Sequence, residues 1–257
     1  MTRNEKLNFA LPDGHMMAHV LPFIKGAGIA FKGYETAHNN RRPILKLVTD
    51  NARKLIKEPE QVAAKIIRPQ DMPVHVANGN FDIAITGTDW IDEHLKCFPD
   101  SPLKMAEDKE ENKHILRLGF GKVRIVAAVQ EEKEDNLSAF VQSFGGEYIR
   151  IASEYVYLAD TYAQENKMYP YRVIMTYGAT ESLIPEDCDI IIENTETGNT
   201  LTQNRLKILD TLKVLGADKS EGCLIANPES MKNASKNEMI EAIFTLFKNY
   251  LQSEGIS

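Results

Sequence analysis

The chain has 257 residues, of which 26% are charged and 43% are hydrophobic, values typical of a globular protein with a sizeable core. Its formal net charge of −7 argues against a general nucleic-acid-binding protein. The apolar runs are far shorter than the ~18 residues of a membrane-spanning helix, and the N-terminus has no stretch suited to a secretory signal. We therefore expect a cytoplasmic protein with no nucleic-acid or membrane partner. Three scattered cysteines predict neither a disulfide framework nor a zinc site.

The N-terminal segment predicts the opening of an α/β unit. A strand-like run at 7–11 is followed by a turn at Asp13 and Gly14 and by a helical pattern from about 15 to 25. Ligands of open α/β sheets bind at the carboxyl ends of the strands. Asp13, Gly14 and His15 are therefore candidate contacts with a ligand.

Two pairs of residues in the N-terminal part of the chain have more than one interpretation. His15 and His19 have the i, i+4 spacing of two metal ligands on one helical face, but no third ligand is apparent, so a packing or solvated pair is favoured. Arg41 and Arg42 would face an anionic substrate in one interpretation. In the other, which their polar surroundings favour, they form a solvated basic turn.

Two further strands are expected to end at the same sheet edge. Residues 62–67 predict a strand that ends in Arg68, and residues 81–85 predict another. An arginine in this position is suited to binding a phosphate. The second strand is followed by residues that suit either a helix cap or a contact with a ligand, namely Thr86, Gly87 and Asp89.

The segment 116–129 predicts a crossover into a second domain. Strands then alternate with helices as far as residue 176, which indicates a parallel sheet with helices on its faces. Gly178 and Glu181 follow the last of these strands and are weaker candidates for a binding site.

A final amphipathic helix, from about 235 to 251, is expected to return to the first domain. That return would make the first domain discontinuous. We expect the first domain to comprise residues 1–119 and 222–257, and the second to comprise residues 120–221.

The stretch from Asp187 to Leu206 predicts a loop that holds a phosphate. Residues 189–192, with three consecutive isoleucines, predict a buried strand, so a loop is expected to start near Glu193. Glycine lets the backbone approach a ligand and hydroxyls donate to anionic oxygens, and the loop contains both kinds of residue in Thr197, Gly198, Asn199 and Thr200. Glu193 and Glu196 would repel a bare phosphate, so the ligand is expected to carry sugar hydroxyls or a divalent cation as well. A phosphorylated ribose fits, although a polar turn without a ligand fits this pattern equally well.

Several familiar motifs are missing from the sequence. It contains no GxxxxGK[ST], GxGxxG, HExxH or GxSxG, and no internal repeat stands out. Walker-type kinases, Rossmann dinucleotide-binding proteins, zincins and α/β-hydrolases therefore lose their main support.

Five groups of segments, in the correct order, resemble the ATP phosphoribosyltransferase family, which catalyses the first committed step of histidine biosynthesis. They are ALPDG; RPQDMPVHVANGNFDIAITGTDW; LGFGKVRIVAAV; YGATE with DIIIENTETGNTLTQNRLKILDT; and LIANP. The resemblance implies two α/β domains with a cleft between them, a periplasmic-binding-protein-like architecture. It also implies a requirement for Mg²⁺, held mainly by substrate phosphates.

In that family, adenine N1 of ATP displaces pyrophosphate from the anomeric carbon of phosphoribosyl pyrophosphate. The resemblance implies that the 5′-phosphate is held by Thr197, Gly198, Asn199, Thr200 and Leu201. Glu193 would lie near the ribose hydroxyls, with Glu196 beside the phosphate. Lys122 and Arg68 are the candidates for stabilising the departing pyrophosphate, with Asp89 and Glu181 as weaker ones.

Two features depart from the family pattern. The first turn, usually basic as in PKGR, reads PDGH here, so Asp13 stands where lysine is expected. His15 or Arg41 would supply the missing charge, or the chain would be a catalytically impaired homologue that binds nucleotides or anions. The chain also lacks the regulatory domain of the family's long form and resembles the short form, which works with a histidyl-tRNA-synthetase-like subunit. We expect a homo-oligomer and leave that partner open.

Overall fold

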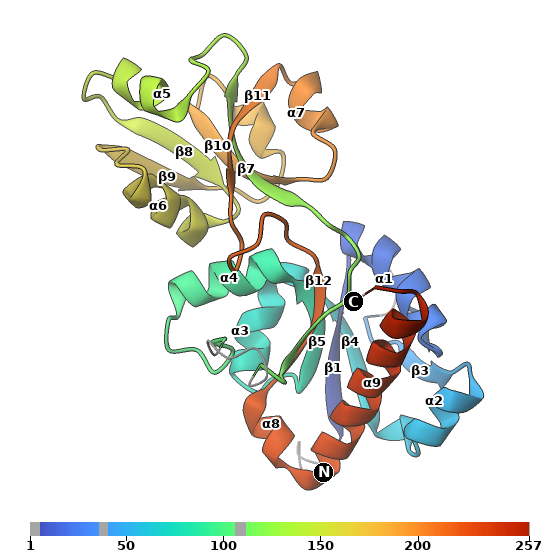
Figure 1. Cartoon of the computed structure of the whole chain (residues 1–257). Coiled ribbons are helices and arrows are strands. Elements are labelled where there is room, and N and C mark those ends of the chain that lie inside the picture. Colours follow the sequence, from blue (N-terminus) through green and yellow to red (C-terminus); the bar gives the residue numbers. More distant parts are fainter. Residues whose placement is uncertain (1–5, 36–40, 106–111, 257) are drawn as a thin grey trace. The chain divides into compact units, whose positions relative to one another are not determined.

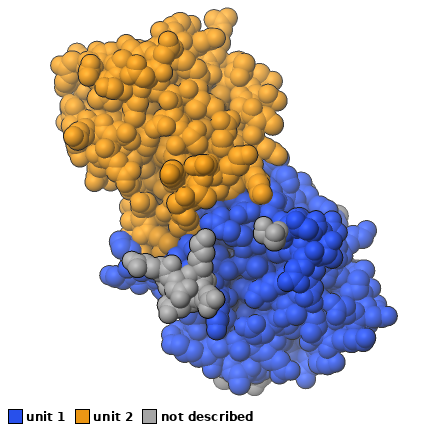
Figure 2. Space-filling view, in the orientation of Figure 1, with its two compact units in different colours: residues 1–91, 99–121, 221–257 blue, residues 92–98, 122–220 orange. Residues whose placement is uncertain are grey.

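The structure is a computed structural model, and it describes residues 6–35, 41–105 and 112–256. The chain divides into two compact units, which Figure 2 colours separately. Unit 1 comprises residues 1–91, 99–121 and 221–257, and unit 2 comprises residues 92–98 and 122–220. The predicted domains differ from these units in the segment 92–98, which the sequence assigns to the first domain, and at residues 120, 121 and 221, which it assigns to the second. Among the described helices, none is long and apolar enough to cross a membrane.

A five-stranded mixed sheet with the order β4-β1-β5-β12-β6 forms the centre of unit 1 (Figure 1). Strand β1 is parallel to β4 and β5, whereas β12 is antiparallel to β5 and β6. The elements of this unit are β1 (Leu7–Pro12), α1 (His15–Gly26), β2 (Ile29–Lys32), β3 (Ile44–Leu47), α2 (Asp50–Leu55), β4 (Val62–Ile67), α3 (Met72–Ala77), β5 (Ile83–Gly87), β6 (Ile115–Arg117), β12 (Gly222–Ala226), α8 (Pro228–Lys232) and α9 (Ala234–Ser253). Helix α4 (Thr88–Cys97) begins in unit 1, and its residues from Asp92 onward belong to unit 2.

Unit 2 has a second five-stranded sheet, with the order β11-β7-β10-β8-β9. Strand β8 is parallel to β9 and β10, whereas β7 is antiparallel to β10 and β11. Its elements are β7 (Arg124–Gln130), α5 (Leu137–Ser143), β8 (Ile149–Ser153), α6 (Val156–Glu165), β9 (Tyr171–Met175), β10 (Ile190–Thr195), α7 (Asn199–Gln203) and β11 (Leu206–Leu212).

The two sheets have the same topology, a repeat that the sequence did not reveal. Reading the second sheet as β9-β8-β10-β7-β11, each strand matches the strand at the same place in β4-β1-β5-β12-β6, and the parallel and antiparallel pairings agree. In each sheet the fourth strand, β7 or β12, follows directly after the chain crosses from the other unit. This strand is antiparallel to both of its neighbours. The expected parallel sheet is therefore correct for β8, β9 and β10 and wrong for β7 and β11.

The final helix packs against the sheet of unit 1, as the periodicity predicted. Helix α9 buries the apolar stripe Ile240, Ile243, Leu246, Phe247 and Leu251. The Phe247 ring meets Phe23 of α1 edge to face, with 5.1 Å between ring centroids. Apolar burial of this kind explains why residues 221–257 belong to the same unit as the N-terminal residues.

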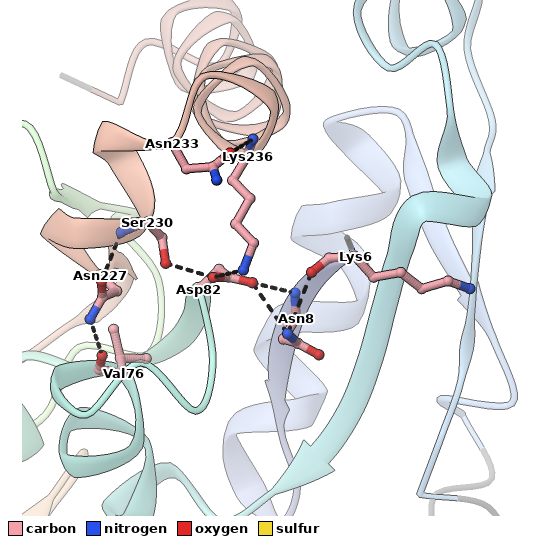
Figure 3. A network of polar contacts seen from close by, with 8 residues as sticks. All are labelled: Lys6, Asn8, Val76, Asp82, Asn227, Ser230, Asn233 and Lys236. Carbon is pink, nitrogen blue, oxygen red and sulfur yellow. Dashed lines mark hydrogen bonds and ion pairs between the residues drawn. The ribbon is translucent and has the colours of Figure 1, made fainter. Parts of the chain in front are cut away.

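A buried aspartate connects this C-terminal segment to the sheet (Figure 3). Asp82, immediately before β5, is 1% exposed. Its Oδ2 accepts a hydrogen bond from the backbone N–H of Asn8 at 2.7 Å, and its Oδ1 accepts from Ser230 Oγ at 2.6 Å and from Lys236 Nζ at 2.9 Å. One carboxylate therefore joins the start of β1, helix α8 and helix α9.

Replacing Lys236 with methionine should destabilise unit 1. The side chains of Lys236 and Asp82 are only 11% and 2% exposed, so the substitution would leave a buried carboxylate without its cation. We expect a loss of about 3–5 kcal/mol in the free energy of unfolding, measured by urea denaturation. Lys232→Met is the control, because Lys232 is 72% exposed where it pairs with Glu229, and it should cost less than about 1 kcal/mol. Equal effects of the two variants would contradict the proposed importance of the buried pair.

Candidate functional site

The carboxyl ends of three parallel strands bring a group of polar residues together in unit 2. Strand β8 leads into Glu154, strand β9 leads through Gly178 into Glu181, and strand β10 contains Glu193. The expected loop after β10 begins later than the sequence predicted. Glu193, Asn194 and Thr195 still belong to the strand, because each pairs with a residue of β7.

Glu193 lies in a half-buried position surrounded by hydrogen-bond donors and other acids. Its Oε1 accepts from the backbone N–H of Asn194 at 2.9 Å and from Asn194 Nδ2 at 3.0 Å, and the Thr180 hydroxyl donates to the same carboxyl. Burial, together with the nearby charges of Glu154 and Glu181, raises the pKa of Glu193 to about 7, although the hydrogen bonds from Asn194 and Thr180 act to lower it. This carboxyl therefore titrates near neutral pH.

The turn between β9 and β10 holds Thr180 in place. Gly178 has φ +111°, a conformation that side chains rarely adopt, and Ala179 follows in the left-handed region. The Thr176 and Thr180 hydroxyls lie 2.8 Å apart in a buried hydrogen bond. The Gly178 and Glu181 of the sequence prediction are thus brought to the same strand ends as Glu193.

The loop from Thr195 to Thr200 is organised by its own hydroxyls. Thr195 Oγ1 accepts from the N–H of Gly198 at 2.8 Å, and Thr197 Oγ1 accepts from the N–H of Asn199 at 3.3 Å. Gly198 has φ +83°, and a Cβ on it would meet no atom within 4 Å, so the glycine is needed for the backbone conformation and not for space. The backbone N–H groups of this loop therefore point at acceptor oxygens.

A short helix that the sequence did not predict follows the loop. Helix α7 starts at Asn199, so the N–H groups of its first turn, those of Thr200 and Leu201 among them, have no acceptor within the helix. Thr200 is exposed, as is Glu196, whereas the Leu201 side chain is buried in the core of unit 2. Leu201 can therefore contribute only its backbone to a ligand.

In unit 1, the candidate residues also gather at the carboxyl ends of the strands. The Asp13 N–H donates to the carbonyl of Ile67 at 3.1 Å, which places Asp13 beside the end of β4 and next to the exposed Arg68. Thr86 Oγ1 donates to the carbonyl of Pro69 at 2.8 Å, so the end of β5 meets the same segment. The sequence predicted this convergence correctly.

The turn after β5 carries its own carboxylate. A Cβ on Gly87 would lie 2.0 Å from Asp89 Oδ1, so the side chain of Asp89 folds back over that glycine. Asp89 is 5% exposed and Thr86 is 0% exposed. These two residues are thus better placed for holding the turn than for meeting a ligand. Gly14 (φ +66°) and His15 are exposed at the start of α1.

The sequence analysis did not identify one cation beside the loop from Thr195 to Thr200. Arg124 lies directly opposite Thr195 in the antiparallel pairing of β7 with β10. The predicted Lys122 is exposed and precedes β7 by two residues. The antiparallel pairing of β7 with β10 places Arg124 beside Thr195. The sequence predicted a parallel sheet, so this neighbour was not expected.

Known proteins resemble the chain over most of its length. The model of the ATP phosphoribosyltransferase family matches residues 68–249. The ATP phosphoribosyltransferase of Chlorobaculum parvum is 30% identical over 252 residues, covering 98% of this chain and 74% of that protein, and that of Thermodesulfovibrio yellowstonii is 27% identical over 253 residues with the same coverage. The chain belongs to the ATP phosphoribosyltransferase family. The sequence-based assignment to this family is confirmed.

The fold agrees with a solved member of this group. The ATP phosphoribosyl transferase (HisG:HisZ) complex from Thermotoga maritima contains a chain that superposes with a TM-score of 0.66 at 20% identity, covering 96% of this chain and 98% of that one. The expected class of two α/β domains is confirmed. An ATP phosphoribosyltransferase is a pentosyltransferase of histidine biosynthesis, which joins adenine N1 of ATP to the anomeric carbon of phosphoribosyl pyrophosphate and releases pyrophosphate.

The raised pKa of Glu193 predicts a pH-dependent stability for this ATP phosphoribosyltransferase. Its pKa is about 7 in the folded chain against an ordinary value of 4.5. The contribution of this carboxyl to the free energy of unfolding is therefore fully present below pH 4.5 and is lost as the pH rises through about 7. Glu193→Gln is neutral at every pH and should remove this part of the pH dependence, measured as the free energy of unfolding from pH 4 to 8. The exposed Glu186→Gln is the control. If Glu193→Gln kept the wild-type pH profile, the buried environment assigned to this carboxyl would be wrong.

Proposed function

We propose that this ATP phosphoribosyltransferase holds the 5′-phosphate of phosphoribosyl pyrophosphate in the loop from Thr195 to Leu201, with Glu193 on the ribose hydroxyls. The observation that carries the proposal is the pattern of hydrogen bonds in the loop. The Thr195 and Thr197 hydroxyl oxygens accept from backbone N–H groups there. Phosphate oxygens are stronger acceptors of the same kind, and successive backbone N–H groups form a natural anion site.

Glu193 explains why the ligand is a sugar phosphate and not a free phosphate. A carboxylate repels a bare anion but accepts hydrogen bonds from vicinal hydroxyls. The Asn194 and Thr180 donors fix its orientation. A ribose 5-phosphate supplies hydroxyls for Glu193 and an anion for the loop, so one ligand satisfies both groups.

The reaction demands positioning and charge stabilisation more than proton transfer. As N1 approaches the anomeric carbon, the ribose acquires oxocarbenium character and the departing pyrophosphate gains negative charge. We assign Lys122 and Arg68 to that developing charge, because both are exposed cations. Gly14, His15 and Gly87 are weaker candidates for contacts with ATP or pyrophosphate.

The acidic group in unit 2 fits a magnesium ion shared with the substrate. Mg²⁺ takes oxygen ligands and is usually held by one or two carboxylates together with substrate phosphates. Glu154 and Glu181 both raise the pKa of Glu193, so a divalent cation here would relieve a repulsion that is already present. We propose that substrate phosphates hold the ion and that Glu193 and Glu181 assist. The bound ion would neutralise charge on the pyrophosphate.

We also propose that the enzyme works as an oligomer with a second kind of subunit. The Thermotoga maritima structure is described as a complex of two components, HisG and HisZ. By analogy, a histidyl-tRNA-synthetase-like subunit is the partner to test first.

Turnover tests the proposed function directly. The purified chain, with ATP, phosphoribosyl pyrophosphate and Mg²⁺, should release pyrophosphate and form an adenine nucleotide ribosylated at N1. The assay is run with and without a histidyl-tRNA-synthetase-like subunit. Nucleotide binding without product under both conditions would instead favour an impaired homologue, the second candidate, for which the acidic Asp13 is the motivating feature.

The loop assignment has its own test. Thr200→Ala removes an exposed hydroxyl at the start of α7 and should weaken binding of phosphoribosyl pyrophosphate roughly 10- to 100-fold, the usual worth of one hydrogen bond to a charged group. Thr202→Ala is the matched control, because this exposed threonine lies in the same helix and its hydroxyl donates to the carbonyl of Gly198. Calorimetric titration measures both affinities. An unchanged affinity in Thr200→Ala would show that the loop is a turn without a ligand.

A further inference from the structure

A buried tyrosine lies between strand β8 and helix α6, directly after one of the acids that surround Glu193. Tyr155 follows Glu154 and is 0% exposed. Its main chain is fixed by Ser153, whose Oγ accepts from the Tyr155 N–H at 2.8 Å and donates to the carbonyl of Ile192 at 2.6 Å. One serine hydroxyl thus holds Tyr155 against the residue that precedes Glu193 in β10.

The tyrosine hydroxyl binds the same side chain that binds Glu193. Asn194 Nδ2 donates to Tyr155 Oη at 3.1 Å and to Glu193 Oε1 at 3.0 Å. The amide nitrogen of asparagine carries two N–H groups, so both are used. The backbone N–H of Asn194 donates to the same Glu193 oxygen at 2.9 Å. Tyr155 therefore fixes the plane of the amide, and the amide fixes one oxygen of the carboxyl.

Satisfying a buried hydroxyl explains only part of this arrangement. A buried tyrosine hydroxyl needs a hydrogen-bond partner, and any nearby donor would supply one. Here the donor is the exposed Asn194, whose other N–H binds the carboxyl proposed to meet the ribose. Successive residues of a strand project to opposite faces of the sheet, so the Asn194 amide needs a second contact to stay turned toward Glu193. Tyr155 supplies that contact.

We propose that Tyr155 and Asn194 are positioning residues that orient Glu193 toward the ribose hydroxyls, and so set the preference of the site for ribose over 2-deoxyribose. The inference rests on the proposed function, since it concerns the carboxyl assigned to the ribose. A carboxyl accepts hydrogen bonds best from hydroxyls that lie near its plane. The orientation of Glu193 therefore determines how much the 2-hydroxyl contributes to binding, although neither Tyr155 nor Asn194 touches the sugar.

Two sugar phosphates that differ in one hydroxyl test the proposal. Ribose 5-phosphate and 2-deoxyribose 5-phosphate carry the same phosphate for the loop from Thr195 to Leu201, so the ratio of their affinities reports the contact with the 2-hydroxyl. The wild type should bind ribose 5-phosphate roughly 10- to 100-fold more tightly, as for a hydrogen bond to a charged group. Asn194→Ala and Tyr155→Phe should each lower this ratio roughly 3- to 10-fold, as for the loss of one neutral hydrogen bond. Calorimetric titration measures both affinities without turnover.

A double-mutant cycle separates positioning from a general structural effect. If Tyr155 acts through Asn194, Tyr155→Phe should lower the ratio in the wild type and leave it unchanged in the Asn194→Ala variant. Tyr162→Phe is the matched control, because it removes the hydroxyl of another buried tyrosine of unit 2, one that donates to Asp210 at 3.2 Å. It should keep the wild-type ratio. An equal loss in Tyr162→Phe would show a structural effect and overturn the proposal.

The remaining results distinguish the positioning role from the proposed function. A wild type without a preference for ribose 5-phosphate would refute the assignment of Glu193 to the ribose hydroxyls, and the positioning role with it. A wild type with this preference, and folded variants that keep it, would overturn the positioning role alone. Thermal unfolding verifies that each variant is folded. Asn194 is exposed, so Asn194→Ala decides the matter even where Tyr155→Phe does not fold.

Discussion

The fold of each unit depends on an aspartate that lies immediately before its central parallel strand. Asp82 precedes β5 and contacts Asn8 at the start of β1 twice: its N–H donates to the Asn8 carbonyl, and its carboxylate accepts from the Asn8 N–H. The carboxylate also pairs with Lys236. Asp189 precedes β10 and does the same at the start of β8: its N–H donates to the Arg150 carbonyl at 2.9 Å, and its Oδ2 accepts from the Arg150 N–H at 2.8 Å. Asp189 also pairs with the Arg150 guanidinium. In both sheets one carboxylate thus sets the register of two adjacent parallel strands and therefore where their carboxyl ends lie.

The segments that follow the central strands, β5 in unit 1 and β10 in unit 2, differ although the two sheets have the same topology. In unit 1 the turn after β5 is filled by a protein carboxylate, because Asp89 folds back over Gly87. In unit 2 the segment after β10 is longer and carries threonine hydroxyls and Gly198 instead. A turn that already holds a carboxylate repels an anion. The loop in unit 2 instead has threonine hydroxyls, and the N–H groups of Thr200 and Leu201 that follow have no acceptor within helix α7, so this segment attracts one. The two units share a topology but differ in the segments after β5 and β10, and this difference is why a phosphate loop is proposed for unit 2 only.

The sequence predicted most elements because their signals are local. The apolar runs of β1, β4 and β8 and the stripe of α9 are visible in periodicity alone. Strand direction and partner choice are not local, which is why the antiparallel β7 and the cation Arg124 beside Thr195 were missed. The internal repeat was missed for the same reason, since short matches such as the Asp-Ile pairs at 82–83 and 189–190 do not stand out in the sequence. Ion pairs across long separations, such as Arg41 with Asp13, were likewise out of reach of residue patterns.

Glu193 shows how a site can oppose the stability of the fold that carries it. A carboxyl with a pKa of about 7 favours folding in its protonated form, yet an acceptor for ribose hydroxyls or Mg²⁺ works best when ionised. A polar neighbour in place of Glu154 or Glu181 would reduce the conflict and stabilise the ionised form. The acidic cluster of Glu154, Glu181 and Glu193 is explained if a positive charge arrives with the substrate. Binding of Mg²⁺ and ribose would then relieve the repulsion between these carboxylates. On that view the unfavourable clustering of acids is itself the part of the site that selects a cation-bearing sugar phosphate over a simple anion.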